Sequence, residues 1–180
     1  MGNHVMIDLE TWGTHDGSII ISLGAVKFDP MSDEDLLADI FYCAIDPTSS
    51  EQFGLKTDAS TITWWMGKDK TVAREKWMSE TKIDLPSTLE GFQDWYGGDN
   101  LPTWGNGATF DNVLLRTAFR KVGLECPWKF WDDRCFRTLK NLTKVEALPD
   151  FGTPHHALTD ALNQAQHLRA IVRRLKIVLE

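Results

Sequence analysis

The stretch from His4 to Trp12 constrains this chain more than any other, because it predicts both a strand and the chemistry on it. Apolar residues alternate there with Met6, Asp8 and Glu10, which is the period of a β-strand. The two carboxylates therefore project from one face, about 6.6 Å apart along the strand. They repel each other and lose hydration, and the segment has no Lys or Arg to neutralise them. A divalent metal ion is the simplest counter-charge, although such a pair is also typical of a solvated strand edge.

The composition indicates one domain over residues 1–180. Hydrophobic residues make up 42% of the chain, enough for a sizeable core. No apolar segment is long enough to span a membrane and no signal-peptide pattern is present, so we expect a cytoplasmic protein with no membrane partner. Three cysteines without a Cys-x-x-Cys pair agree with reduced thiols. The net charge of −7 argues against broad coating of nucleic acid but permits a small site that binds phosphates through metal ions.

The first half of the chain predicts strands and then helices. Three strands with short connections favour an antiparallel meander, at residues 4–12, 19–28 and 39–45. Gly24, inside the second strand, marks a close approach of another backbone or a ligand. Helices are expected at 60–66, at 72–79 and through Trp95, the last opened by a capping box of Ser87 with Glu90.

The second half alternates strands with helices. We expect strands at 101–104 and 128–131, and helices at 110–122, 135–142 and from Ala157 to Leu179. Such alternation implies parallel crossovers. The predicted fold is therefore α/β, a mixed five-stranded sheet of three antiparallel strands followed by two parallel ones, flanked by helices. A flavodoxin-like sheet would need a helix between the first strands, and the spacing leaves no room for it.

Asp111 follows a predicted strand and the turn Gly105-Asn106-Gly107, at the start of a predicted helix. Aspartate is common at this position because its side chain caps exposed backbone N–H groups. The same position would also allow the carboxylate to join Asp8 and Glu10 at the end of the sheet. Both interpretations are open from this segment alone.

His155 and His156 precede the last predicted helix, and Asp160 lies about one turn inside it. A preceding proline restricts the backbone, so the histidines are expected on the loop that leads into the helix. Asp160 lies between Ala157 and Ala161, where the helix can approach the sheet closely, and an unpaired carboxylate there is costly. A surface histidine and an exposed aspartate are the alternative.

Taken in order, these motifs resemble those of the DEDDh exonucleases, the DnaQ-like family of 3′→5′ exonucleases with an RNase H-like fold. The matching segments are Asp8-Leu9-Glu10-Thr11, Gly107-Ala108-Thr109-Phe110-Asp111 and His155-x-Ala-Leu-x-Asp160-Ala. The Trp64-Trp65 pair and the run Trp104-Gly-Asn-Gly are most similar to a compact phage- and prophage-associated branch, itself similar to bacterial exoribonuclease-like members. The chain departs from the family pattern at Ser22 and at Trp12-Gly13, in the region of the nucleotide pocket.

The resemblance implies hydrolysis of phosphodiester bonds at the 3′ end of single-stranded DNA or RNA, with release of nucleoside 5′-monophosphates and with two Mg²⁺ or Mn²⁺ ions. It implies that Asp8 bridges both ions, Glu10 and Asp160 hold one, and Asp111 holds the other. It makes His155 the general base, because the spacing from His156 to Asp160 does not fit the motif. A base must be neutral, so activity should fall below the pKa of His155, at ~6.5 or somewhat higher.

Several assignments remain open. The backbone of Thr11 and the ring of Trp12 are candidates for contact with the terminal nucleotide, and core packing is the alternative for Trp12. Core packing is expected for the tryptophans at positions 64, 65, 77, 95, 128 and 131. Arg134 and Arg137 either contact phosphate or pair with acids. Many members of the family are homodimers, and the alternative to an enzyme is a catalytically silent domain that binds nucleic acid or a partner.

Overall fold

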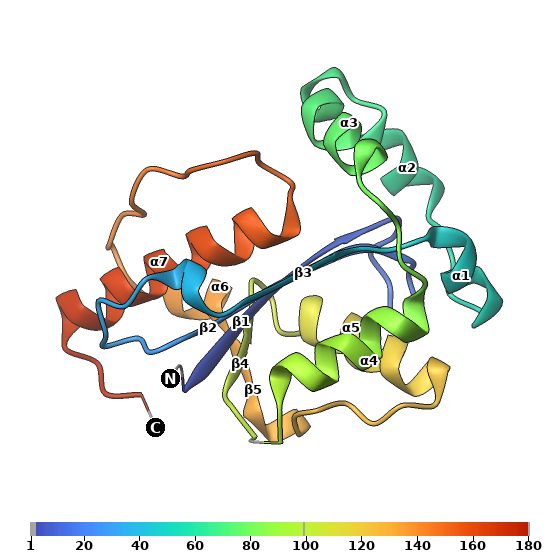
Figure 1. Cartoon of the computed structure of the whole chain (residues 1–180). Coiled ribbons are helices and arrows are strands. Elements are labelled where there is room, and N and C mark those ends of the chain that lie inside the picture. Colours follow the sequence, from blue (N-terminus) through green and yellow to red (C-terminus); the bar gives the residue numbers. More distant parts are fainter. Residues whose placement is uncertain (1–2, 99, 180) are drawn as a thin grey trace.

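A five-stranded mixed sheet lies at the centre of the computed structural model, which describes residues 3–98 and 100–179 (Figure 1). Its strands are β1 (His4–Thr11), β2 (Ile20–Phe28), β3 (Ile40–Ala44), β4 (Thr103–Gly105) and β5 (Asp133–Cys135). They follow the spatial order β3-β2-β1-β4-β5. β1 pairs antiparallel with β2, and β2 with β3, whereas β1 with β4 and β4 with β5 are parallel. The predicted sheet is confirmed.

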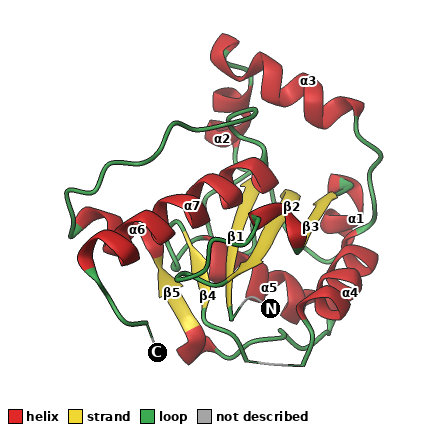
Figure 2. Cartoon of the chain, turned by 60° about the vertical axis from the view of Figure 1, so that its left-hand side comes forward, coloured by secondary structure: helices red, strands yellow, loops and turns green. Residues whose placement is uncertain are grey.

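Helices cover both faces of this sheet (Figure 2). The two layers contain α4 (Leu85–Tyr96), α5 (Asp111–Val122), α6 (Phe136–Asn141) and α7 (Ala157–Leu175). The alternation in β1 explains the division, because its apolar residues at positions 5, 7 and 9 belong to the core with α4 and α5, whereas Met6 belongs to the core with α6 and α7. Asp8 and Glu10 share the face of Met6 and therefore point toward α7.

The segment between β3 and α4 contributes three further helices, and α2 and α3 stand away from the two layers (Figure 1). These helices are α1 (Pro47–Gln52), α2 (Ala59–Trp65) and α3 (Thr71–Ser79). Two indole N–H groups attach the segment to the sheet, since Trp65 donates to the carbonyl of Thr11 and Trp77 to that of Ile21, each at 2.8 Å. Short 3₁₀ turns complete the fold, namely η1 (Leu36–Ala38), η2 (Lys68–Lys70) and η3 (Phe130–Asp132).

Gly24 is the point at which α7 meets the sheet. A Cβ atom at this position would lie 2.2 Å from the carbonyl carbon of Ala157 and from the amide nitrogen of Leu158. The close approach predicted at Gly24 is confirmed, and the approaching backbone is the first turn of α7. Because Gly24 pairs with Asp8 across the sheet, this contact brings the start of α7 to the acidic part of β1.

Three predicted boundaries are wrong. The fifth strand is β5 rather than residues 128–131, because Trp128 turns into the core and its indole N–H donates to the Asp133 carboxylate at 2.8 Å. Helix α4 is capped by Asp84, which accepts from the Ser87 N–H at 2.9 Å, so no capping box begins at Ser87. Helix α7 ends at Leu175 because Lys176 adopts a left-handed conformation with φ of 54°. Within the part of the chain that the structure describes, no helix is long and apolar enough to cross a membrane.

Candidate active site

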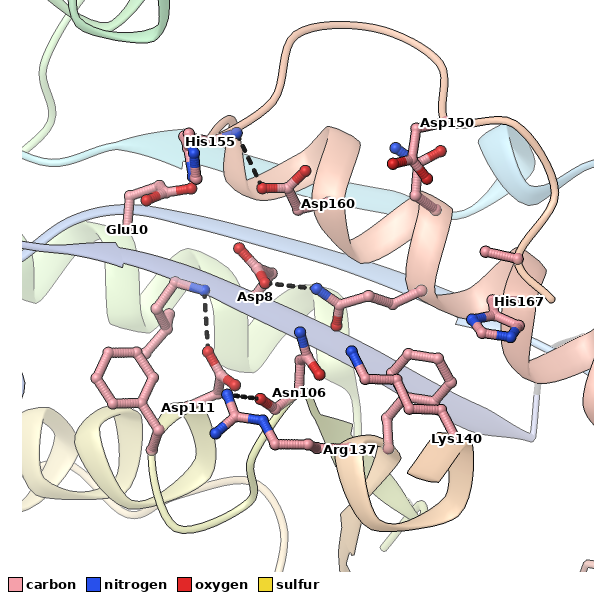
Figure 3. Close-up of a pocket in the computed structure, with 16 residues that line it drawn as sticks. Asp8, Glu10, Asn106, Asp111, Arg137, Lys140, Asp150, His155, Asp160 and His167 are labelled. Carbon is pink, nitrogen blue, oxygen red and sulfur yellow. Dashed lines mark hydrogen bonds between the residues drawn. The ribbon is translucent and has the colours of Figure 1, made fainter. Parts of the chain in front are cut away.

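Four acidic side chains from three separate elements converge on one cavity. Asp8 and Glu10 come from β1, Asp111 is the first residue of α5, and Asp160 lies in the first turns of α7 (Figure 3). The cavity has a volume of about 440 Å³, and His155 also lines it. Residues far apart in the sequence, predicted to share a site, therefore lie together at the end of β1.

Hydrogen bonds hold three of these carboxylates in place. The backbone N–H of Leu9 donates to Asp111 Oδ1 at 3.3 Å, which links the start of α5 to β1. Gln164, one turn after Asp160 on α7, donates from Nε2 to Asp8 Oδ1 at 2.7 Å. The backbone N–H of His155 donates to Asp160 Oδ2 at 3.0 Å. Each bond joins two elements or segments, so the packing of the fold fixes the geometry of the site.

One group within the cavity has the spacing of a metal site. Glu10, His155 and Asp160 each offer a ligand atom, and these atoms lie within 4.8 Å of one another. His155 has a φ of 58°, a left-handed conformation that is uncommon outside glycine. This backbone conformation brings the imidazole of His155, which lies in the loop before α7, over Glu10 (Figure 3).

Burial raises the pKa of all four acids, and repulsion by the neighbouring carboxylates adds to this effect at Asp8 and Glu10. Burial raises the pKa of Glu10 to about 8, with the charges of Asp160 and Asp111 adding to the effect, and raises that of Asp111 to about 7. Burial is also the main cause that raises the pKa of Asp160 to about 6. The pKa of Asp8 rises well above its ordinary value through burial and through the charges of the other three acids. Only 9% of Glu10 and 3% of Asp111 is exposed to solvent.

No lysine or arginine forms an ion pair with any of these four acids within residues 3–98 and 100–179. Buried carboxylates without a cationic partner either bind protons or bind a metal ion. Clustered carboxylate oxygens are hard donors of the type that Mg²⁺ and Mn²⁺ prefer. The residues present therefore fit divalent cations of this class.

A second cavity of about 380 Å³ continues from Glu10 toward α2. Thr11 lines it, together with the aromatic rings of Trp64, Trp65 and Phe110. Trp64 is 46% exposed and Trp131 63% exposed, so the expectation that these two pack in the core is wrong, whereas Trp65 and Trp128 are buried as expected. Sequence reasoning overlooked Phe110 although it directly precedes Asp111.

Trp12 does not line either of these cavities. Its ring packs edge-to-face on Trp77, with 5.5 Å between the ring centroids. Simple alternation would put Trp12 on the face of Asp8 and Glu10, but the pairing of β1 with β2 shifts between Glu10 and Thr11. Such an irregularity re-aims the side chains that follow it. Core packing, the alternative considered for Trp12, is what the structure shows.

Three basic or polar residues at the site were missed or left open by the sequence. Lys70 is only 9% exposed, with Nζ 4.4 Å from the ring centroid of Trp64. Its charge is the second cause, after burial, that lowers the pKa of His155 below its ordinary value. Arg137 lines the acidic cavity and donates to the carbonyl of Asn106. Of these three residues, only Gln164 could have been predicted from the sequence, because it lies four residues after Asp160 and hence on the same face of the helix.

The pattern of these residues agrees with comparisons to known proteins. The domain family described as the 3′-5′ exoribonuclease Rv2179c-like domain matches residues 3–172. The chain belongs to this family. It is also 25% identical over 167 residues to an exodeoxyribonuclease of Enterobacteria phage T4, an alignment that covers 79% of this chain and 70% of the phage protein. The chain is thus a DnaQ-like 3′-5′ exonuclease of the DEDDh family, as its motifs predicted.

Solved structures show the same fold. Cell-death related nuclease 4 (CRN-4) gives a TM-score of 0.60 at 14% identity, over 94% of this chain and 64% of that one. The nuclease domain of 3′hExo, a DEDDh family member bound to rAMP, gives 0.57 at 18% identity, over 96% and 90%. The zinc-bound complex of E. coli ExoI with single-stranded DNA gives 0.62 at 13% identity, over 98% and 41%. The exonuclease therefore spans less than two thirds of CRN-4 and ExoI and shares their RNase H-like architecture.

Proposed function

We propose that this exonuclease uses two Mg²⁺ or Mn²⁺ ions to remove nucleoside 5′-monophosphates from the 3′ end of single-stranded DNA or RNA. The observation that carries the proposal is the convergence of Asp8, Glu10, Asp111 and Asp160 beside His155, without an ion pair to any of the four in the described ranges. Four carboxylates in this position would weaken binding of a polyanion by themselves. With two divalent cations the same site attracts a phosphodiester.

Each residue has a role in this proposal. Bound ions of this kind neutralise the scissile phosphate, lower the pKa of the attacking water and stabilise the leaving oxygen. Asp8, Glu10, Asp111 and Asp160 would hold the ions through their carboxylate oxygens. His155 accepts the proton of the attacking water on an imidazole nitrogen. Gln164 orients the carboxylate of Asp8 through their hydrogen bond.

His155 is suited to act as the base at neutral pH. Burial and the charge of Lys70 lower its pKa below the ordinary value, so the imidazole is neutral through a wider pH range than a free histidine. The expectation of a pKa at or above ~6.5 is therefore corrected downward. A base must be neutral, so the decline of activity on acidification should come at a lower pH.

The cavity beside Glu10 supports a single-stranded 3′ end as substrate. Trp64 and Phe110 offer aromatic faces on which any base can stack, and Thr11 offers a polar contact. A paired strand would present its bases to the opposite strand rather than to these rings. The Rv2179c-like family is described by activity on RNA and the phage relative by activity on DNA, so the proposal includes both RNA and DNA as substrates.

Digestion of matched DNA and RNA oligomers tests the proposal. With Mg²⁺ or Mn²⁺, a 5′-labelled strand should shorten one nucleotide at a time, and a 3′-labelled strand should lose its label as a mononucleotide in the first step. EDTA should stop both reactions. The Asp8→Ala variant, purified in the same way, should be inactive, and equal activity in that variant would show that a contaminant is responsible.

A catalytically silent binding domain is the competing function. It predicts that the wild-type protein retards single-stranded oligomers on a gel but leaves them intact with either metal. Intact oligomers under all of these conditions would overturn the nuclease proposal.

A further inference from the structure

A second group of polar side chains lies next to His155 but outside the acidic cavity. It consists of Tyr42, Glu80 and His156, which we call the Glu80 cluster. The ring of His156 stacks on that of Tyr42 with 4.4 Å between centroids. The hydroxyl of Tyr42 donates to Glu80 Oε2 at 2.5 Å, and His156 Nε2 lies 3.3 Å from Glu80 Oε1. The proposed chemistry uses none of these three residues.

The cluster joins three elements that are distant in the sequence. Tyr42 lies in β3, Glu80 directly follows α3, and His156 is the N-cap residue of α7. Only 11% of the His156 side chain and 17% of the Glu80 side chain is exposed, so water competes little for these contacts. Lys76 also contacts Glu80 Oε1, at 3.2 Å, from the exposed side of α3.

The two nitrogens of His156 have different partners, which fixes the orientation of its ring. Nδ1 accepts from the backbone N–H of Thr159 at 3.4 Å and so caps α7. Because Nδ1 is the acceptor, Nε2 carries the proton in the neutral ring, and this N–H lies on the side of Glu80 Oε1, 3.3 Å away. A rotation of the ring would break both contacts at once.

His155 depends on this anchor because of its backbone conformation. Its φ of 58° is a strained value for a residue other than glycine, and surrounding contacts must hold it. On one side, the N–H of His155 donates to Asp160 at 3.0 Å. On the other side, the next residue is His156, whose ring is held by Glu80 and Tyr42. Further back along the loop, the N–H of Phe151 donates to the side chain of Asn163 at 3.2 Å and its C=O accepts from that side chain at 3.1 Å, which ties the loop to α7 but does not fix the His155 backbone directly.

We propose that Glu80, supported by Tyr42, is a positioning residue that holds His156 and thereby aims the imidazole of His155 at the attacking water. This role rests on the proposed function of His155 as the general base. Glu80 does not touch substrate or metal in this scheme. Its effect passes through the backbone that joins the two histidines.

Two single variants test the role of the cluster. Glu80→Ala removes both acceptor oxygens, and His156→Asn keeps a side chain that caps α7 but is too short to reach Glu80. A displacement of about 1 Å at a catalytic group costs up to about 100-fold in rate, so we expect each variant to lower kcat by about 10- to 100-fold. KM for a single-stranded oligomer should stay within about twofold, because substrate binding groups are unchanged. Glu80→Gln, which keeps one acceptor oxygen, should recover much of the lost kcat.

The decisive comparison uses a protein that lacks the base. If Glu80 acts through His155, Glu80→Ala should lower kcat in the wild type but change it by no more than about twofold in the His155→Ala background. The double variant Glu80→Ala/His156→Asn should also be no slower than the slower single variant. Glu75→Ala, which changes an exposed glutamate of α3, is the matched control and should leave kcat unchanged.

The possible outcomes separate this inference from the proposed function. An inactive wild-type protein would overturn the proposed function itself. An active wild type in which Glu80→Ala has the same effect with and without His155, or raises KM rather than lowering kcat, would assign Glu80 a general structural role and overturn the inference. Thermal melting of each variant provides the check on folding, and Glu80→Gln and His156→Asn keep the test valid if Glu80→Ala unfolds.

Discussion

At the scale of single residues, Asp111 shows how function and stability oppose each other. It is almost fully buried, and its pKa is raised to about 7 mainly by burial. The N–H of Leu9 offsets part of that cost. A neutral side chain of the same shape would keep this hydrogen bond and remove the buried charge. The carboxylate is therefore expected at this position for its proposed role in binding a cation rather than for the fold.

The Asp111→Asn variant tests this opposition. We expect kcat to fall by at least about 100-fold, the lower range for loss of a transition-state electrostatic contact. We expect the metal-free protein to melt at a higher temperature than wild type at pH 8, because one ionised group fewer is buried there. Nuclease assays and thermal melts in EDTA measure the two effects. Asp94→Asn, an exposed position of α4, should change neither, and a lower melting temperature for Asp111→Asn would contradict the argument.

Trp64 provides a second prediction at this scale. If its half-exposed ring stacks on the terminal base, Trp64→Ala should raise KM by about 5- to 150-fold, since base stacking contributes about 1–3 kcal/mol. The melting temperature should change little because the ring is 46% exposed. Trp131→Ala is the control, since Trp131 is 63% exposed and does not line either cavity. Equal KM values for the two variants would remove Trp64 from the substrate site.

At the scale of elements, the position of α7 on the sheet decides whether the site exists. This helix carries Asp160 and follows His155, and its first turn lies directly over Gly24. Its small residues Ala157, Ala161 and Ala165 are fully buried, which permits the close approach. A shift of α7 away from β2 would separate Asp160 from Asp8 without altering either residue.

Gly24→Ala tests this dependence. The added methyl group would meet the backbone of α7 at 2.2 Å, so the helix must move. Overpacking of this kind costs about 1–3 kcal/mol, and we expect that loss of stability together with a strong loss of kcat. Gly91→Ala is the matched control, because its methyl group would meet only the Phe41 ring at 3.8 Å and alanine is the better helix former. Denaturant unfolding and nuclease assays would show an unaffected Gly24→Ala protein if the close contact were unimportant.

At the scale of the whole molecule, the clustered acids make stability depend on pH and on metal. The raised pKa values of Asp160, Asp111 and Glu10, about 6, 7 and 8, mean that the folded state binds protons that the unfolded chain has already released. The stability these protons provide is complete below the ordinary carboxyl pKa of ~4 and is lost as the pH rises through these values.

The metal-free protein should therefore melt at a lower temperature at pH 8.5 than at pH 6, by at least about 3 °C, the shift expected for about 1 kcal/mol in a chain of this size. Mn²⁺ should raise the melting temperature, and more at pH 8.5 than at pH 6, because protons no longer compete for the carboxylates. Thermal melts in EDTA and in Mn²⁺ measure both. In the Asp8→Asn/Glu10→Gln variant, the melting temperature of the metal-free protein should depend less on pH. An unchanged pH dependence would show that groups other than these two acids cause it.

Local sequence patterns were sufficient to predict much of the fold and of the candidate site. The alternation in β1 identified the face that carries Asp8 and Glu10, because strand period depends only on backbone geometry. The order of strands and helices predicted the mixed sheet, and three short motifs predicted the acids and the histidine that line one cavity. Boundaries failed where a short-range side-chain contact changed the local path of the chain, as when the Trp128 indole contacted the Asp133 carboxylate and β5 began only at Asp133.

Only the tertiary structure decided what surrounds the acids. The sequence by itself determined which side chains can ionise and which face of their own element they occupy, since both follow from residue type and spacing. It did not determine that α2 brings Trp64 beside Glu10 while a register shift turns Trp12 toward Trp77. It also did not reveal the contact of Glu80 with His156, because such contacts depend on how separate elements pack and not on any pattern within one of them.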